Sequence, residues 1–354
     1  MRLNWRPLLA RAAVLVYICL AYYGLRCVRP SVPTENSYRG RVYVSQLLDG
    51  PSVNVAIKRG ITTRHIYVSF VDAGYKDVGL NWIAAAPQDV LTATTIFTTD
   101  TTSLAALKPV AVSARLPANN AKECQEFQPK WILKHAIVLA VLRGLNRSKQ
   151  VDFVTWFDID CIFLKPYHSW LNHKLMQMSQ VDDVVLFAQR GVHPHSIYSR
   201  VGATICLGLF TVRPKALEFY ESFWLSITEK HVSSDTNTEN ETEYDINCRH
   251  DDQWAFNVHV EKYMGLNYKA MVKNDLRIDS ALTVSDQVFV RGERSIRTSF
   301  LPYAEFPRSI SPEMNISEFR QLRDIGARVW HMGAEKYGGS KISAMKRDGV
   351  WLLS

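Results

Sequence analysis

Residues 153–166 read FVTWFDIDCIFLKP, and the fold of this chain can be worked out from this stretch. Its first five residues form an almost continuous apolar run, which is typical of a strand buried on both faces. Asp158 and Asp160 follow at the carboxyl end of this strand, where open α/β sheets bind their ligands. Because residues i and i+2 of an extended chain face the same way, we expect both carboxylates on one face. Two such oxygen ligands can hold Mg²⁺ or Mn²⁺ while water and the phosphates of a ligand complete the shell.

The two aspartates also have a simpler interpretation, because a D-x-D triplet is common in turns, where aspartates cap or solvate the end of a strand. That interpretation must explain two carboxylates set between two apolar runs, FVTWF and CIFL. Burying unpaired charge at such a position is costly. The sequence therefore favours a metal site, with the solvated turn as the alternative.

Strands and helices alternate on both sides of this segment. Apolar, β-rich runs predict strands at 65–71, 90–99, 153–157, 183–189 and 204–212. Apolar residues at helical spacing predict a helix through Leu80–Ile83, one from Pro129 to Gly144, and two more starting near Pro214 and Asp251. This alternation predicts an α/β fold with a mainly parallel sheet flanked by helices. No linker rich in Gly, Pro or Ser interrupts the chain after residue 60, so we expect one large domain.

The N-terminal part of the chain differs in composition from the rest. Residues 12–25 contain no charge, and Tyr22, Tyr23 and Arg26 at the end of this run suit a membrane interface. A membrane anchor is therefore favoured over a cleaved signal peptide or a buried core helix. The expected organisation is a cytoplasmic tail at 1–11, a transmembrane signal anchor at 12–27, a stem at 28–60 and a single domain at 61–354.

Glycosylation sequons and cysteines bear on the compartment. Three sequons begin at Asn146, Asn240 and Asn315, all beyond the apolar segment. They favour a lumenal domain, hence a single-pass type II protein of the Golgi or ER membrane. The cysteines include no C-x-x-C pair, so a zinc cluster is not expected. If a disulfide forms in an oxidising lumen, Cys124 and Cys248 are the favoured pair.

The net charge of +8 does not indicate nucleic-acid binding. The first 30 residues contain five arginines and no acidic residue, so the rest of the chain has only a modest positive excess. No basic helix or aromatic–basic stripe accompanies that excess. It fits a local site for an anionic ligand better.

The segment FDIDCIFLKP resembles the D-x-D element of metal-dependent glycosyltransferases with the GT-A fold. Other segments stand in the order that these families use, namely PKWILKHAIVLAVL before it and GLFTVRPKALEFYESFW, HDDQWAFN and VWHMG…GGSK…DGVW after it. Over most of its length the chain is similar to the retaining galactosyl-, xylosyl- and mannosyltransferases of plants and fungi, and to the plant nucleotide-diphospho-sugar transferase family. The resemblance implies an enzyme that uses Mn²⁺ or Mg²⁺ to transfer a sugar from a nucleotide-diphosphate sugar to a glycan or glycoprotein acceptor, with retention of anomeric configuration.

The resemblance also implies roles for individual residues. Asp158, Asp160 and His331 would bind the metal, although a lone histidine is more often an ordinary surface or core residue. Asp252 and Gln253 would lie near the reacting carbon. The nucleotide sugar would contact Asp72, Asp100, Lys134, Asp158, Gly339 and Lys341.

Two features leave alternatives open. A solvated lysine beside Lys130 is an equal interpretation of Lys134. Cys206-Leu-Gly208 stands where the family commonly has Asn-x-Gly, so the resemblance does not name the donor sugar.

The main rival function is that of a phosphatase of the haloacid dehalogenase type, with the first aspartate of the D-x-D pair as nucleophile and the second as general acid. That class usually has Thr or Val where this chain has Ile162, and its motif stands near the start of the chain. A third interpretation is a catalytically silent glycan-binding protein on the same fold.

Overall fold

The computed structural model describes residues 43–353, apart from gaps at 117–127, 146–149, 165–167, 179–183, 192, 195–196, 199–203, 229–251, 264–289, 292–296, 302–304, 307–322, 324–325 and 332–339. The expected tail, the expected anchor and residues 28–42 of the expected stem lie outside these residues, as do the three sequon asparagines and the pair Cys124 and Cys248. In the described part of the chain, no helix is both long enough and apolar enough to cross a bilayer.

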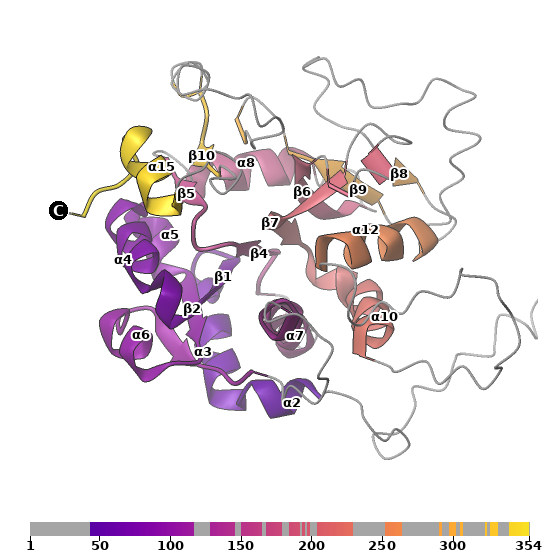
Figure 1. The fold of residues 1–354 in the computed structure, drawn as a ribbon. Coiled ribbons are helices and arrows are strands. Elements are labelled where there is room, and N and C mark those ends of the chain that lie inside the picture. The colour runs from indigo at the N-terminus through magenta and orange to yellow at the C-terminus, as the bar shows by residue number, and fades with distance from the viewer. Residues whose placement is uncertain are drawn as a thin grey trace, which may run out of the picture. The chain divides into compact units, whose positions relative to one another are not determined.

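An eight-stranded sheet in the order β3-β2-β1-β4-β7-β6-β9-β8 forms the centre of the described structure (Figure 1). Its strands are β1 (His65–Val71), β2 (Thr94–Thr98), β3 (Ala111–Ser113), β4 (Phe153–Phe157), β6 (Val184–Gly191), β7 (Thr204–Val212), β8 (Val290–Arg291) and β9 (Arg297–Phe300). Neighbours run parallel from β3 to β4 and between β6 and β9, whereas β7 is antiparallel to β4 and β6, and β8 to β9. The expected α/β class and its mostly parallel sheet are confirmed.

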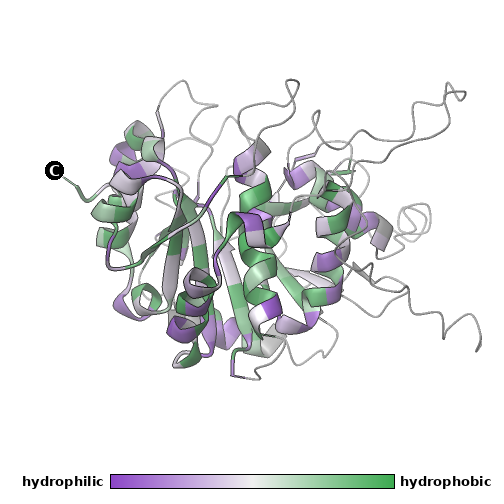
Figure 2. Cartoon of the chain, turned by 90° about the horizontal axis from the view of Figure 1, so that it is seen from below, coloured by the Kyte–Doolittle hydropathy of each residue, from purple (hydrophilic) through white to green (hydrophobic). Residues whose placement is uncertain are grey.

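Helices cover both faces of this sheet. On one face lie α2 (Val44–Leu47), α3 (Gly50–Ile61), α7 (Gln128–Leu145), α10 (Leu217–Thr228) and α12 (Asp252–Tyr263). On the other lie α4 (Lys76–Ala85), α5 (Gln88–Thr92), α6 (Thr101–Ala106), α8 (His168–Met178) and α15 (Lys341–Arg347), with a small sheet of β5 (Ile162–Phe163) and β10 (Val329–Trp330). The helices on each face enclose a hydrophobic core against the sheet, the first core on the face of α7 and the second on the face of α4. Residues of β1 alternate between them: Ile66 and Val68 belong to the first core, and Tyr67 to the second. Figure 2 shows hydrophobic residues filling the central strands.

The folded domain begins earlier than expected. The compact unit starts at Val42, and α2 and α3 pack against α7 and β1. Val44, Leu47 and Ala56 are buried there, so residues 44–60 belong to the folded domain and their assignment to a stem is wrong. Pro51 lies in the first turn of α3, where a proline is tolerated because the backbone N–H that it lacks would have no partner within the helix.

A second correction concerns the strand expected at 90–99. Residues up to Thr92 form α5, and β2 is limited to Thr94–Thr98. The run 90–99 mixes apolar residues with five threonines, and a short run of this kind does not distinguish a buried strand from a buried helical turn. By contrast, the strands expected at 153–157 and 204–212 coincide with β4 and β7.

Candidate metal centre

The two aspartates of the D-x-D element lie in a turn rather than in a strand. β4 ends at Phe157 and β5 begins at Ile162. Between them the amide of Cys161 donates to the Asp158 carbonyl at 2.8 Å, which closes the turn. The amide of Asp158 donates to the Gly208 carbonyl of β7 at 2.7 Å. The carboxylates therefore converge because the chain turns, and the expectation of an extended segment at this point was wrong.

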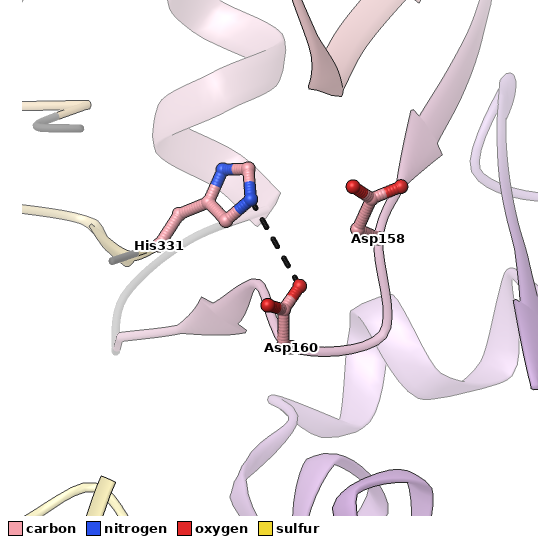
Figure 3. A group of neighbouring side chains, drawn as sticks. All are labelled: Asp158, Asp160 and His331. Carbon is pink, nitrogen blue, oxygen red and sulfur yellow. Dashed lines mark ion pairs between the residues drawn. The ribbon is translucent and has the colours of Figure 1, made fainter. Parts of the chain in front are cut away.

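The third candidate ligand reaches the turn through the small sheet. Trp330 of β10 pairs with Ile162 of β5, so His331 emerges beside the aspartates although it is far away in sequence. Its Nε2 atom lies 3.9 Å from Oδ1 of Asp160, and the residue is 2% exposed. One ligand atom from each of Asp158, Asp160 and His331 lies within 4.8 Å of the others (Figure 3). The structure thus brings together the three residues expected to bind a metal ion.

Contacts around Asp158 hold its carboxylate in place. The indole Nε1 of Trp156 donates to its Oδ1 at 3.0 Å. A methyl group added at Gly208 would lie 3.0 Å from its Oδ2 and 2.0 Å from Cε1 of His331. Glycine at 208 therefore leaves the space into which the ligands converge. No pattern in the sequence indicated the role of Trp156, and Gly208 stood out only as the glycine of the Cys206-Leu-Gly208 segment.

Lys341 supplies a cation next to Asp160. It is the first residue of α15, which is capped by Ser340, and its Nζ lies 2.5 Å from Oδ2 of Asp160. The segment after this helix is fixed to the second core, because Trp330 Nε1 donates to Asp348 Oδ2 at 2.7 Å and Asn81 bonds the backbone of residues 350 and 352. Gly339, the other residue expected here, lies outside the described residues.

Lys134 of α7 is buried between two carboxylates. Its Nζ lies 2.8 Å from Oδ2 of Asp252 and 3.5 Å from Oδ1 of Asp158, and it donates to the Leu207 carbonyl at 3.3 Å. Burial opposes its charge, but these two carboxylates outweigh burial and raise the pKa of Lys134 above its ordinary value. The same pairing holds the pKa of the Asp252 carboxyl well below its usual range against the opposing effect of burial. The interpretation of Lys134 as a solvated lysine is therefore wrong.

His135, the next residue on α7, adds a buried titratable group that the sequence reading missed. Its Nε2 lies 3.5 Å from Oδ2 of Asp252, and the ring is 1% exposed. Burial lowers the pKa of His135, and the nearby Asp252 opposes that shift only in part. The imidazole packs against Phe223 at 4.8 Å between ring centroids.

Gln253 joins α12 to β7. It accepts from the Leu207 amide at 3.4 Å, and its Nε2 donates to the His193 carbonyl at 2.6 Å. One turn later, Asn257 bonds both the amide and the carbonyl of Ile205. These contacts fix the start of α12, and with it Asp252, against the strand that contains Gly208.

Asp72 and Asp100 follow β1 and β2, and each caps the helical segment that comes next. Asp100 accepts from the Ser103 amide at 2.7 Å at the start of α6. The pKa of Asp100 is lowered because these capping bonds outweigh the opposing effect of its burial. Asp72 accepts from the Tyr75 amide at 3.1 Å and pairs with Lys130 at 2.6 Å. Their place at the carboxyl edge of the sheet agrees with the sequence, and contact with a nucleotide stays a prediction.

Comparison with known proteins gives distant structural neighbours. No family model matches the sequence, and no curated protein matches it. The chain is similar in structure to a glycosyltransferase involved in the glycosylation of the major capsid of PBCV-1, with 9% identity, a TM-score of 0.39, and coverage of 81% of this chain and 99% of that chain. It is also similar to mouse xyloside xylosyltransferase 1 in its apo form, with 7% identity, a TM-score of 0.29, and coverage of 45% and 71% respectively.

Proposed function

We propose that the chain is a metal-dependent glycosyltransferase that transfers a sugar from a nucleotide-diphosphate sugar to a glycan or glycoprotein acceptor with retention of configuration. The observation that most supports this proposal is the convergence of Asp158, Asp160 and His331 from two distant parts of the sequence, with Lys341 beside them. The sequence resemblance described above supports the glycosyl donor, the acceptor and retention.

The three residues fit a hard divalent cation. Carboxylate oxygens and one imidazole nitrogen form a donor set that suits Mn²⁺. The same set can hold Mg²⁺, although Mg²⁺ binds the imidazole nitrogen less readily than Mn²⁺ does. Three protein ligands leave the remaining positions for water and the phosphates of a nucleotide sugar. When bound, the cation would neutralise negative charge on the departing diphosphate.

The chain's own residues have separate tasks in this proposal. Lys341 presents its ammonium beside Asp160, where it can also stabilise the negative charge of the leaving diphosphate. Lys134 keeps Asp252 ionised and fixed beside Asp158. The Asp252 carboxylate is then available to stabilise positive charge that develops on the sugar in the transition state. Gln253 holds Asp252 at the edge of the site by bonding β7.

The test combines binding and product analysis. The chain is incubated with Mn²⁺ and a panel of nucleotide-diphosphate sugars, and its thermal unfolding is measured. A donor at 100 times its dissociation constant should stabilise the fold by about 2.7 kcal/mol. Asp160→Asn should abolish this shift, whereas Asp152→Asn, a control at the exposed pair with Arg64, should retain it. Nucleotide release with sugar incorporation supports the proposal, phosphate release supports a phosphatase, and neither product supports a catalytically silent protein.

We also propose that residues 12–27 anchor the chain in the Golgi or ER membrane with its domain in the lumen. The uncharged run with aromatic residues and Arg26 at its edge supports this placement. The sequon at Asn240 provides a test in cells that secrete glycoproteins. Endoglycosidase treatment should increase the gel mobility of the wild-type chain and should change an Asn240→Gln variant less. Unchanged mobility of the wild type would contradict the lumenal placement.

A further inference from the structure

Gln189 of β6 contacts the candidate ligand His331 from the side opposite the aspartates. Its Oε1 lies 2.7 Å from Nδ1 of His331, and the pair is buried. The other half of its amide is fixed as well, because Nε2 of Gln189 donates to the Phe306 carbonyl at 3.2 Å. The oxygen of the amide, which can only accept, is therefore the atom that faces the ring.

This arrangement decides which nitrogen of His331 has the proton. A neutral imidazole has one donor nitrogen and one acceptor nitrogen. With an acceptor 2.7 Å from Nδ1, the proton belongs on Nδ1, and the lone pair belongs on Nε2. Nε2 is the atom that lies 3.9 Å from Oδ1 of Asp160, on the side of the three converging ligand atoms.

The backbone places the Gln189 amide at this position. The pairing of β6 with β7 shifts register at this residue: Ala188 pairs with Phe210, and Gln189 pairs with Cys206. Irregularities of this kind bend a strand and redirect side chains, and they are common next to active sites. The residues of β7 that the shift passes over include Gly208, which makes room for the same imidazole.

We propose that Gln189 is a positioning residue that holds His331 in the Nδ1-protonated tautomer and so presents Nε2 to a divalent cation. The inference rests on the proposed function, because it assumes that His331 is a ligand. Hydrogen-bonded partners of metal-bound histidines fix the ring and its tautomer, and their loss typically lowers metal affinity about 10- to 100-fold. Nothing in the local sequence around Gln189 indicates this role.

The first measurement needs no metal. The full chain is labelled with ¹⁵N-histidine, and ¹⁵N–¹H correlation spectra are recorded at pH 8 without divalent ions, with His331→Gln used to assign the signal. We expect the wild-type ring to be protonated on Nδ1. Gln189→Met, which keeps the length but removes the acceptor, should move the proton to Nε2. Gln189→Glu, which keeps an oxygen opposite Nδ1, should retain the wild-type tautomer.

The second measurement is the affinity for Mn²⁺, read from the electron paramagnetic resonance signal of the free ion. Gln189→Met should weaken binding by about 10-fold or more, and Gln189→Glu should lie closer to the wild type. Asn172→Leu is the matched control, because it removes another hydrogen bond between an amide and a buried histidine, His65, outside the ligand set. It should leave the affinity unchanged.

The outcomes separate the two proposals. A wild-type His331 protonated on Nε2, or a Gln189→Met variant with the wild-type tautomer and affinity, would overturn the role of Gln189. The wild-type tautomer decides the question even if Gln189→Met does not fold. Failure of the wild-type chain to bind Mn²⁺ would overturn the proposed metal centre, independently of the tautomer that is read without metal.

Discussion

Gly208 of β7 lies against the imidazole of His331 with no room for a side chain between them. A methyl group at Gly208 would stand 2.0 Å from Cε1 and 2.6 Å from Nε2 of that ring. Any movement of the ring away from β7 would disturb its contact with Gln189, because His331 is buried and its Nδ1 is bonded to that residue. A glycine in β7 is therefore part of the geometry that lets β10 deliver a histidine to the D-x-D turn.

Gly208→Ala should displace His331 from the aspartates. We expect the affinity for Mn²⁺ to fall by about 10-fold or more, and the free energy of unfolding to fall by about 1–3 kcal/mol from overpacking. Metal titration and urea unfolding measure the two effects. Gly50→Ala is the control, because a methyl group there meets nothing within 4 Å, and it should change stability by less than about 0.5 kcal/mol. Wild-type affinity in Gly208→Ala would show that the close approach has no importance for the site.

Lys341 and a divalent cation compete for Asp160. The ammonium lies 2.5 Å from Oδ2 of Asp160 and compensates the charge that a cation would otherwise compensate. Lys341→Gln should therefore bind Mn²⁺ alone about 5- to 30-fold more tightly, corresponding to about 1–2 kcal/mol, because one charge-assisted hydrogen bond no longer has to break. Sugar transfer should become slower, because the leaving diphosphate loses a positive charge.

The control for this prediction lies on the same helix. Lys346 of α15 is exposed and stands over the Trp351 ring at 5.8 Å, so Lys346→Gln removes an equal charge away from Asp160. It should leave both the Mn²⁺ affinity and the transfer rate unchanged. Equal effects of the two variants would mean that net charge, and not the contact with Asp160, governs metal binding.

Removing Lys134 should leave Asp252 as a buried carboxylate without its nearest cation. Breaking a buried ion pair from one side costs about 3–5 kcal/mol, so we expect Lys134→Met to lower the free energy of unfolding by that amount. Urea unfolding measures it. Lys130→Met, at the more exposed pair with Asp72 on the same helix, should cost about 1 kcal/mol or less. Adding Asp252→Leu to Lys134→Met should recover part of the loss, and full additivity of the two changes would argue against a direct pair.

The strands that could be predicted from sequence are those that form a nearly continuous apolar run. β4 and β7 are buried on both faces, so their limits follow from continuous apolar runs. The direction of β7 cannot be predicted from its apolar run. Whether β7 lies parallel or antiparallel to β4 depends on contacts between residues that are far apart in the sequence. The helices α2 and α3 were missed for different reasons: α2 is too short to show a helical period, whereas Asp49 at the N-cap and Pro51 in the first turn of α3 are local signals that the assignment to a stem overlooked.

The candidate site divides in the same way. Asp158 and Asp160 stand two residues apart, so the sequence placed them together, although the turn that joins their carboxylates was not foreseen. His331 could be predicted as a ligand only from the family resemblance. The pairing of β5 with β10 that brings it to the aspartates is a contact between residues far apart in the sequence. Gln189 and His135 could not be found from sequence, because a single buried polar residue has no local signature that separates a site from an ordinary core.

His135 should make the stability of the chain depend on pH. It packs between the rings of Tyr220, Phe223 and Phe256, and burial lowers its pKa. The unfolded chain therefore takes up a proton at this residue at a higher pH than the folded chain does, and the free energy of unfolding falls as the pH drops below about 6.5. Urea unfolding of wild type and His135→Phe at pH 7, 6 and 5 should show the smaller fall in the variant.

Asp252 does not disturb this comparison, because its lowered pKa keeps it ionised in the folded state and its ordinary pKa of about 3.9 keeps it ionised in the unfolded state. The exposed His173, replaced by glutamine, is the control and should fall in parallel with the wild type, whereas an equal fall in His135→Phe would place the pH dependence elsewhere.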